Sequence, residues 1–226
     1  MRLNADFDRR VVIRPEDRAW VPSPMPGVAR QLLDRVGDEV ARATSIVRYA
    51  PGSRFSAHTH GGGEELLVLD GVFSDEHGDY PAGTYVRNPI GSSHAPHSEG
   101  GCTILVKLHQ FAADDARQVA LPTRGVPFLP GLVPGLSVLP LHEHGTEHTA
   151  LVRWAPGTRF QPHQHWGGEE IYVVEGTFAD EHGEYPEGTW IRSPHGSRHA
   201  PYSEPGCLIY VKTGHLTPAA LGRYAA

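Results

Sequence analysis

The chain has 226 residues, of which 39% are hydrophobic and 20% are charged, and its formal net charge at neutral pH is -6. Nucleic acids and anionic membranes are bound by clustered Lys and Arg, so this acidic balance argues against both as partners. No stretch is apolar for long enough to span a bilayer, and the amino terminus lacks the apolar core of a secretory signal, so we expect a cytoplasmic protein. The 26 glycines and 20 prolines favour short strands and frequent turns over helices.

The amino-terminal part of the chain contains strand signals but no chemistry. The run Val11-Val12-Ile13 predicts an edge strand, or a strand that swaps onto a partner chain in a homodimer. Two antiparallel strands are predicted over residues 31–36 and 39–48, joined by a turn at residues 37–38.

A cluster of metal-ligand residue types begins at His58-Thr59-His60 and continues, after three glycines, with Glu64. Side chains at i and i+2 leave the same face of a strand, so His58 and His60 point together. The glycines allow a tight reversal that brings Glu64 beside the two imidazoles. His94 completes a set of three imidazoles and one carboxylate. Burial of these groups without a partner would be costly, so the pattern predicts a bound metal ion.

The same cluster recurs 105 positions later, as His163, His165, Glu169 and His199. An isolated His-x-His pair is more often structural than metal-binding, but four ligand types in the same register, twice, favour metal. The two copies align without a gap from about residue 150 to residue 212 of the second copy, which indicates duplicated architecture. We therefore expect two domains, residues 1–110 with an amino-terminal extension and residues 111–226 with a linker.

Apolar and polar residues alternate over 64–70 and 84–88, which is the pattern of half-buried strands. The expected fold class is therefore all-β, a small antiparallel barrel or jelly roll that is formed twice. In the turns 75–78 and 180–183 the residues Asp, Glu, His and Gly follow one another. We interpret these turns as hairpin caps rather than functional groups.

The predicted ligands constrain the metal. Nitrogen and oxygen donors without thiolate suit Zn(II) or Fe(II), which we expect first, and also Mn(II) or Ni(II), with one divalent ion in each domain. Three imidazoles and one carboxylate leave a single net positive charge, and they leave room for one or two further ligand atoms at five or six coordination. Glu65 and Glu170 follow the ligand carboxylates directly, so alternation turns them to the opposite face.

The two copies differ around the clusters. Ser56 corresponds to Gln161, and Gly61 corresponds to Trp166. We expect Ser56 and Gln161 to face the barrel interior and the Trp166 ring to cover the mouth of the second pocket, which would then be the narrower and more aromatic of the two.

Two further sets of residues have a plain structural interpretation. Cys102 and Cys207 occupy equivalent strand positions in separate domains, so we expect inert thiols rather than a disulfide or an oxidation sensor. His142, His144 and His148 occur only in the second copy, and we expect them to be exposed to solvent.

The spacing of these residues resembles the two cupin motifs. The first copy matches the first motif at Gly52, His58, His60, Glu64 and Gly71, and the second motif at Gly83, Pro89, Gly91 and His94. The runs at 63–65, 73–83 and 93–96 look more narrowly like the ChrR-like cupins, a family named for the carboxy-terminal domain of an anti-sigma factor. The resemblance implies a bicupin of two tandem jelly-roll, or double-stranded β-helix, barrels.

The resemblance implies two alternative functions. Similarity to the anti-sigma factor implies a metal-binding protein that responds to a small molecule or an oxidant. The family's helical, zinc-binding part that holds the sigma factor is not expected here, because no cysteine precedes Cys102. The alternative is a metal-dependent dioxygenase acting on a small diketone or hydroxyketone, as in related three-histidine cupins. The expected partner is a small molecule in both cases.

Overall fold

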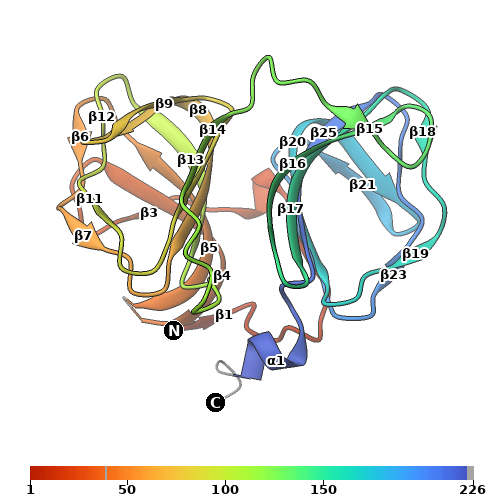
Figure 1. Cartoon of the computed structure of the whole chain (residues 1–226), viewed down its shortest axis with the longest axis horizontal. Helices are drawn as coiled ribbons and strands as arrows, with labels where there is room; N and C mark the ends of the chain where they lie inside the picture. The colour runs from red at the N-terminus through yellow and green to blue at the C-terminus, as the bar shows by residue number, and fades with distance from the viewer. Residues whose placement is uncertain (39, 223–226) are drawn as a thin grey trace. The chain divides into compact units, whose positions relative to one another are not determined.

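Strands account for nearly all of the regular structure (Figure 1). The computed structural model describes residues 1–38 and 40–222. Unit 1 comprises Met1–Ala5 and Arg18–Val126, and unit 2 comprises Asp6–Asp17 and the chain from Pro127 onward. Each unit contains one copy of the repeat, which confirms the all-β class and the duplication.

Unit 1 is built on one antiparallel sheet. Its strand order is β1 (Arg2–Leu3), β4 (Val28–Gly37), β5 (Ala41–Tyr49), β13 (Cys102–Leu108), β8 (Glu64–Asp75), β10 (Thr84–Asn88) and β14 (Val119–Pro122). Shorter strands pair at its margins: β3 (Val21–Pro22), β6 (Ser53–Arg54), β9 (Gly78–Pro81) and β12 (His97–Ser98). A separate pair is formed by β7 (His58–Thr59) and β11 (Ser93–His94). The pairing of β4 with β5 confirms the two strands predicted at 31–36 and 39–48, although residue 39 itself lies outside the described residues.

Unit 2 repeats this plan. Its strand order is β15 (Leu129–Pro130), β16 (Leu136–His144), β17 (Glu147–Trp154), β25 (Cys207–Thr213), β20 (Glu169–Asp180), β22 (Trp190–Ser193) and β2 (Val11–Ile13). The marginal strands are β18 (Thr158–Arg159), β21 (Gly183–Pro186) and β24 (Tyr202–Ser203), and the separate pair is β19 (His163–Gln164) with β23 (Arg198–His199).

The last strand of each main sheet comes from the segment that precedes the repeat of the other unit. In unit 1, β14 pairs with β10 and aligns Val119 with Arg87, and in unit 2, β2 pairs with β22 and aligns Val11 with Arg192. The run Val11–Ile13 is thus an edge strand, which was one of the two predicted alternatives. This exchange makes the observed units differ from the ranges 1–110 and 111–226 at residues 6–17 and 111–126.

Each unit has its own apolar core, because alternate residues of the long strands face inward. Leu66, Val68 and Phe73 of β8 are among the buried residues of the unit 1 core, and Ile171 and Val173 of β20 hold the same places in unit 2. Complete burial of a side chain such as Leu66, which is 1% exposed, contributes about 2 kcal/mol relative to an exposed position.

Over residues 1–38 and 40–222, helix is limited to two short pieces, η1 (Pro15–Asp17) and α1 (Pro218–Leu221). Of the residues that the structure describes, none lies in a helix long and apolar enough to cross a membrane.

Candidate metal centres

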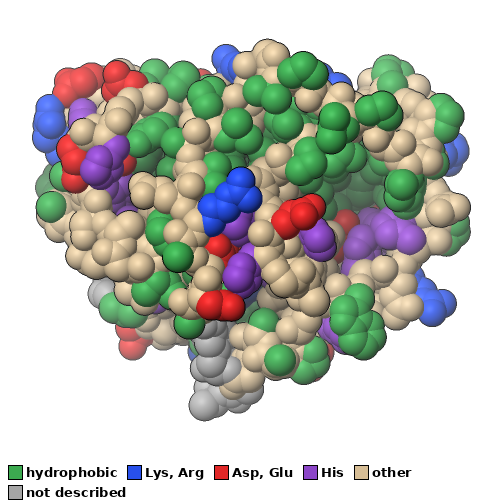
Figure 2. Space-filling model, viewed as in Figure 1, with side chains coloured by type: hydrophobic (Ala, Val, Ile, Leu, Met, Phe, Trp, Pro, Cys, Tyr) green, Lys and Arg blue, Asp and Glu red, His purple; other side chains and the backbone are tan. Residues whose placement is uncertain are grey.

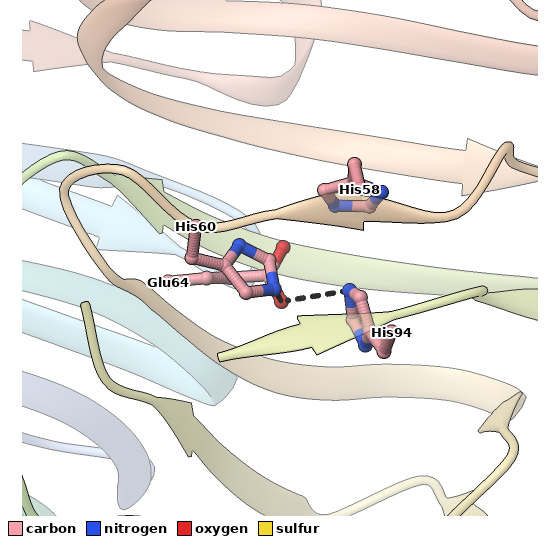
Figure 3. A group of neighbouring side chains, drawn as sticks. All are labelled: His58, His60, Glu64 and His94. Carbon is pink, nitrogen blue, oxygen red and sulfur yellow. Dashed lines mark ion pairs between the residues drawn. The ribbon is translucent and has the colours of Figure 1, made fainter. Parts of the chain in front are cut away.

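The strand pair β7–β11 brings together the three histidines of unit 1 that were predicted to bind metal. His58 on β7 lies directly opposite His94 on β11, and His60 follows two residues after His58. Glu64 is the first residue of β8, beyond the glycine turn. The three imidazole ring centres lie 4.7–4.9 Å apart, and the Glu64 carboxylate points toward the rings of His60 and His94 (Figure 3). We call the group His58, His60, Glu64 and His94 site 1.

The donor atoms of site 1 face one another. One nitrogen from each imidazole and one Glu64 oxygen all lie within 4.8 Å of each other. Glu64 Oε2 is 3.6 Å from His60 Nε2 and 3.5 Å from His94 Nε2. Both of these nitrogens are buried and have no hydrogen-bond partner among the described residues. Buried polar atoms are normally satisfied, so this convergence of unpaired donors fits a bound cation.

Unit 2 brings the equivalent residues together at site 2, which we define as His163, His165, Glu169 and His199. His163 lies opposite His199 in the β19–β23 pair, and the three imidazoles offer nitrogens within 4.8 Å of one another. The Nε2 atoms of His165 and His199 are 2.9 Å apart. Glu169 Oε2 lies 3.5 Å and 3.6 Å from these two nitrogens, although it is not within 4.8 Å of every donor in the group.

Site 2 lies near the surface. His163 is partly exposed, whereas His165 and His199 are buried. On the face that carries β19 and β23, histidine side chains lie in a hollow with hydrophobic side chains above it (Figure 2).

The glycine turns place the two glutamates. Gly63 and Gly168 have φ angles of +77° and +72°, in the left-handed region that favours glycine. A Cβ atom on Gly63 would lie 2.3 Å from the Phe111 ring, so both the backbone angle and the space require glycine. The predicted tight reversal between the histidines and the carboxylate is therefore present.

Burial sets the protonation of several of the predicted ligand residues. It lowers the pKa values of His60 and His163, and it lowers the pKa of His165 to about 3. These imidazoles are neutral near pH 7 and keep a lone pair for a metal ion. Burial also raises the pKa of Glu169 to about 7. A cation between these atoms would favour the ionised carboxylate.

Backbone carbonyls behind the first-motif histidines orient their rings. His58 Nδ1 is 2.9 Å from the Ser56 carbonyl oxygen, and His163 Nδ1 is 3.0 Å from that of Gln161. If each Nδ1 donates to its carbonyl, Nε2 remains the free acceptor. The side chains of Ser56 and Gln161 are exposed, so the prediction that they face the interior is wrong. The contribution of these residues to the site comes from the main chain.

The turn at Asp75 does more than cap a hairpin. Asp75 Oδ1 accepts the backbone N–H of His77 at 2.8 Å, as a cap does, while Oδ2 lies 3.1 Å from His94 Nδ1. Glu76 accepts the backbone N–H of Ala95 at 2.8 Å. Such a carboxylate fixes the tautomer and orientation of a metal-binding imidazole. The residue pattern alone did not indicate this role, although an Asp-Glu pair begins 19 positions before the second-motif histidine in both copies.

Asp180 occupies the same place in unit 2, with Oδ2 at 3.5 Å from His199 Nδ1. Burial acts to raise the pKa of Asp180, but hydrogen bonds with His199, Tyr185 and the His182 N–H outweigh it and lower the pKa to about 2. Burial likewise acts to lower the pKa of His199, and the bond to Asp180 reverses this and raises it. The carboxylate therefore stays ionised behind the imidazole.

Glu65 and Glu170 turn away from the sites, as alternation predicts, but they are buried rather than solvated. Glu65 accepts hydrogen bonds from the Tyr85 hydroxyl and from Arg87, both at 3.0 Å. Glu170 accepts the indole N–H of Trp190 at 2.8 Å and lies 2.9 Å from His215 Nε2. These glutamates therefore tie neighbouring strands together on the face opposite the ligands.

Trp166 does not line a buried pocket. It is 71% exposed, and its ring packs edge-on against His195 with ring centres 4.5 Å apart. The turn after His165 directs the indole outward, so the narrower second pocket that the sequence suggested receives no support from this side chain.

The predictions for the other histidines and for the cysteines are confirmed only in part. His148 is exposed and lies 3.4 Å from Glu143, but His142 is only 3% exposed, which contradicts its expected exposure. His142 lies opposite the buried Thr149 of β17, and its side chain is on the buried face of β16, whereas that of the next residue, Glu143, is exposed. Cys102 and Cys207 are buried free thiols, and burial raises the pKa of each to about 11, consistent with inert strand positions.

The chain forms two antiparallel barrels. Each barrel holds three histidines close to a glutamate that begins its longest strand, and this arrangement defines a bicupin. The family model for the ChrR cupin-like domain matches residues 8–112 and again residues 116–217. The chain therefore belongs to the ChrR cupin-like family and contains two copies of its domain.

Solved structures share the fold at low sequence identity. A "putative dioxygenase" from Nostoc punctiforme is 16% identical, with a TM-score of 0.75 over 93% of this chain and 86% of that chain. A variant of oxalate decarboxylase from Bacillus subtilis is also 16% identical, with a TM-score of 0.61 over 90% and 76%. A cupin 2 conserved barrel domain protein from Leptotrichia buccalis is 11% identical, with a TM-score of 0.59 over 85% and 91%. No curated protein sequence matches the chain.

Proposed function

We propose that each barrel binds one divalent metal ion and that the protein uses the remaining coordination positions to bind a small molecule or respond to an oxidant. The observation that carries this proposal is the convergence of three imidazole nitrogens and the Glu64 oxygen within 4.8 Å at site 1. The buried, unpaired Nε2 atoms of His60 and His94 support it further. The equivalent residues of site 2 give the chain a capacity of two ions.

Nitrogen and oxygen ligands suit zinc, iron, manganese and nickel, and of these four we propose zinc or iron first. One related structure concerns Mn(II) centres in oxalate decarboxylase from Bacillus subtilis, which supports including manganese. A bound ion would act as a Lewis acid toward an oxygen atom of the small molecule. The chain's own part is to hold four donors rigidly, to orient the imidazoles and, by burial, to keep those of His60, His163 and His165 neutral.

A metal-dependent dioxygenase is the second candidate. It is supported by the three-histidine set and by the structural likeness to the Nostoc punctiforme protein. Glu64 weighs against it, because a fourth protein ligand lowers the charge on the ion and occupies a position that an oxygenase would leave open. The first function is therefore the better supported of the two.

The experiment that separates these functions uses protein stripped with a chelator and reloaded under anaerobic conditions with Fe(II) or Zn(II). Oxygen uptake is measured with a panel of diketones and hydroxyketones, and melting temperature is measured with the same compounds and with peroxide. We expect metal-dependent shifts in melting temperature without oxygen uptake. Uptake that depends on Fe(II) and is lost in a His60→Ala, His165→Ala double variant would establish the dioxygenase instead. Melting curves that no compound shifts in a metal-dependent way would contradict the sensing role.

A further inference from the structure

The carboxylate behind His199 has a guanidinium partner, whereas among the described residues the carboxylate behind His94 contacts no guanidinium. Arg10 Nη2 lies 2.9 Å from Asp180 Oδ2 and 2.7 Å from the Tyr185 hydroxyl. The Tyr185 hydroxyl in turn donates to Asp180 Oδ1 at 2.7 Å. The same Oδ2 atom therefore faces the Arg10 guanidinium on one side and His199 Nδ1, at 3.5 Å, on the other.

Strand register identifies the unit 1 counterpart of Arg10. Arg87 and Arg192 are equivalent, because they stand 105 positions apart, as the two metal-ligand sets do. Val119 pairs with Arg87, and Val11 pairs with Arg192. The residue before Val11 is Arg10, so the residue before Val119, Gln118, is its counterpart.

The aromatic contacts place the two segments on the same face of their units, although Phe7 stands three residues before Arg10 and Phe111 stands seven residues before Gln118. The equivalence of Arg10 and Gln118 therefore rests on the strand register. The Arg87 guanidinium lies 3.9 Å from the ring centre of Phe111, and the Arg192 guanidinium lies 4.4 Å from that of Phe7. The segments 6–17 and 111–126 thus cover the same face of their respective barrels. Gln118 is neutral and exposed, whereas the Arg10 side chain is only 29% exposed and reaches Asp180.

The remaining bonds of the two aspartates match. Asp75 accepts from the Tyr80 hydroxyl at 3.1 Å and from the His77 N–H, as Asp180 accepts from Tyr185 and from the His182 N–H. Both carboxylates are therefore anchored without help from the preceding segment. The carboxylate-to-imidazole distance is 3.1 Å in unit 1 and 3.5 Å in unit 2, where Arg10 competes for the same oxygen.

We propose that Arg10 is a positioning residue that makes site 2 bind its metal ion more weakly than site 1. The inference rests on the metal binding proposed above. A carboxylate that shares its charge with a guanidinium supports the partial positive charge of a metal-bound imidazole less well. The positive charge of Arg10 also repels a metal dication bound on the other side of Asp180 and His199. The segment before the first repeat thereby sets the affinity of the second barrel, and the two sites fill at different metal concentrations.

The test is a reciprocal exchange of the two counterparts, Arg10→Gln and Gln118→Arg, with Arg9→Gln as the control at an exposed neighbouring arginine. Site 2 is measured in a His60→Ala background and site 1 in a His165→Ala background, by competition for Zn(II) with a chromophoric chelator. We expect Arg10→Gln to tighten site 2 by up to about tenfold, Gln118→Arg to weaken site 1 by a similar factor, and Arg9→Gln to change neither.

A second measurement distinguishes tuning from simple anchoring of the segment. Co(II) bound to site 2 should change its visible absorption in Arg10→Gln, because the electronic character of His199 changes. Unaltered or weaker Zn(II) binding in Arg10→Gln would overturn the proposal, whether or not the melting temperature of the metal-free protein also falls. Absence of Zn(II) and Co(II) binding at both sites of the parent chain would instead contradict the proposed function itself.

Discussion

The orientation of single imidazoles decides how well these sites are organised. His94 presents Nε2 toward Glu64 because Asp75 lies behind its Nδ1 at 3.1 Å, and His58 is held in the same way by a backbone carbonyl. Loss of a carboxylate behind a metal-binding histidine typically costs 10–100-fold in metal affinity.

A substitution at Asp75 tests this arrangement directly. Asp75→Asn should lower the Zn(II) affinity of site 1 by about 10–100-fold, since the amide carries no charge to support the imidazole. Asp79→Asn is the matched control, because Asp79 lies in the same hairpin but accepts from Ser74 and is exposed. Chelator competition in the His165→Ala background measures both. Equal affinities for Asp75→Asn and the parent would rule out the orienting role.

The pH dependence of site 2 follows from Glu169, whose pKa burial raises to about 7 from 4.5. Below pH 7 the carboxyl group must lose a proton before it can bind a cation, so affinity should rise with pH until about 7 and then level off for this group. His165, with a pKa of about 3, is already neutral over that range and adds no dependence. His199, whose pKa the bond to Asp180 raises, must also lose its proton before it binds a cation and makes the rise steeper.

The same shift affects the metal-free fold. A raised pKa favours the folded state below pH 4.5, and this contribution is lost as the pH rises through about 7.

Zn(II) competition at a series of pH values in the His60→Ala background checks the binding prediction. An affinity for site 2 that does not change between pH 5 and pH 7 would show that Glu169 carries no proton to be displaced.

Among the elements, the turn between β7 and β8 fixes the geometry of site 1. Gly63→Ala should lower the free energy of unfolding by more than about 1 kcal/mol, because alanine is strained at a φ angle of +77° and its Cβ would meet the Phe111 ring. It should also reduce the metal content of site 1 and leave site 2 filled.

Gly100→Ala provides the control for this turn. A Cβ at Gly100 has open space around it, so the variant should keep the parent's melting temperature and metal content. Differential scanning calorimetry and elemental analysis of both variants make the comparison. A Gly63→Ala protein with parental stability and two full sites would mean that the turn tolerates a side chain and does not place Glu64.

The elements also show what sequence could predict. The strand pairs that hold His58 opposite His94 and His163 opposite His199 follow from residue spacing, because i,i+2 alternation and glycine turns are local rules. The contact between Asp75 and His94 is not local, since it depends on a hairpin folding back against another strand. The exposure of Trp166 depended on the path of one turn after His165.

At the scale of the whole chain, the repeat predicted two barrels but not their boundaries. Segment 6–17, which precedes the first repeat, completes the sheet of unit 2. Segment 111–126, which precedes the second repeat, completes the sheet of unit 1. Their strands are only three and four residues long, so neither the apolar run at Val11–Ile13 nor that at Val119–Pro122 could identify its partner from sequence alone. This exchange is what brings Arg10 to Asp180.

We expect both four-residue sites to bind metal, each independently of the other. Elemental analysis of protein purified without added metal, set against protein concentration from amino-acid analysis, measures this. We predict two divalent ions per parent chain, one ion in His60→Ala and one in His165→Ala, and none in the double variant. A double variant that retains two ions, or a parent chain that binds none after purification and after titration with Zn(II), Fe(II), Mn(II) and Ni(II), would contradict the account.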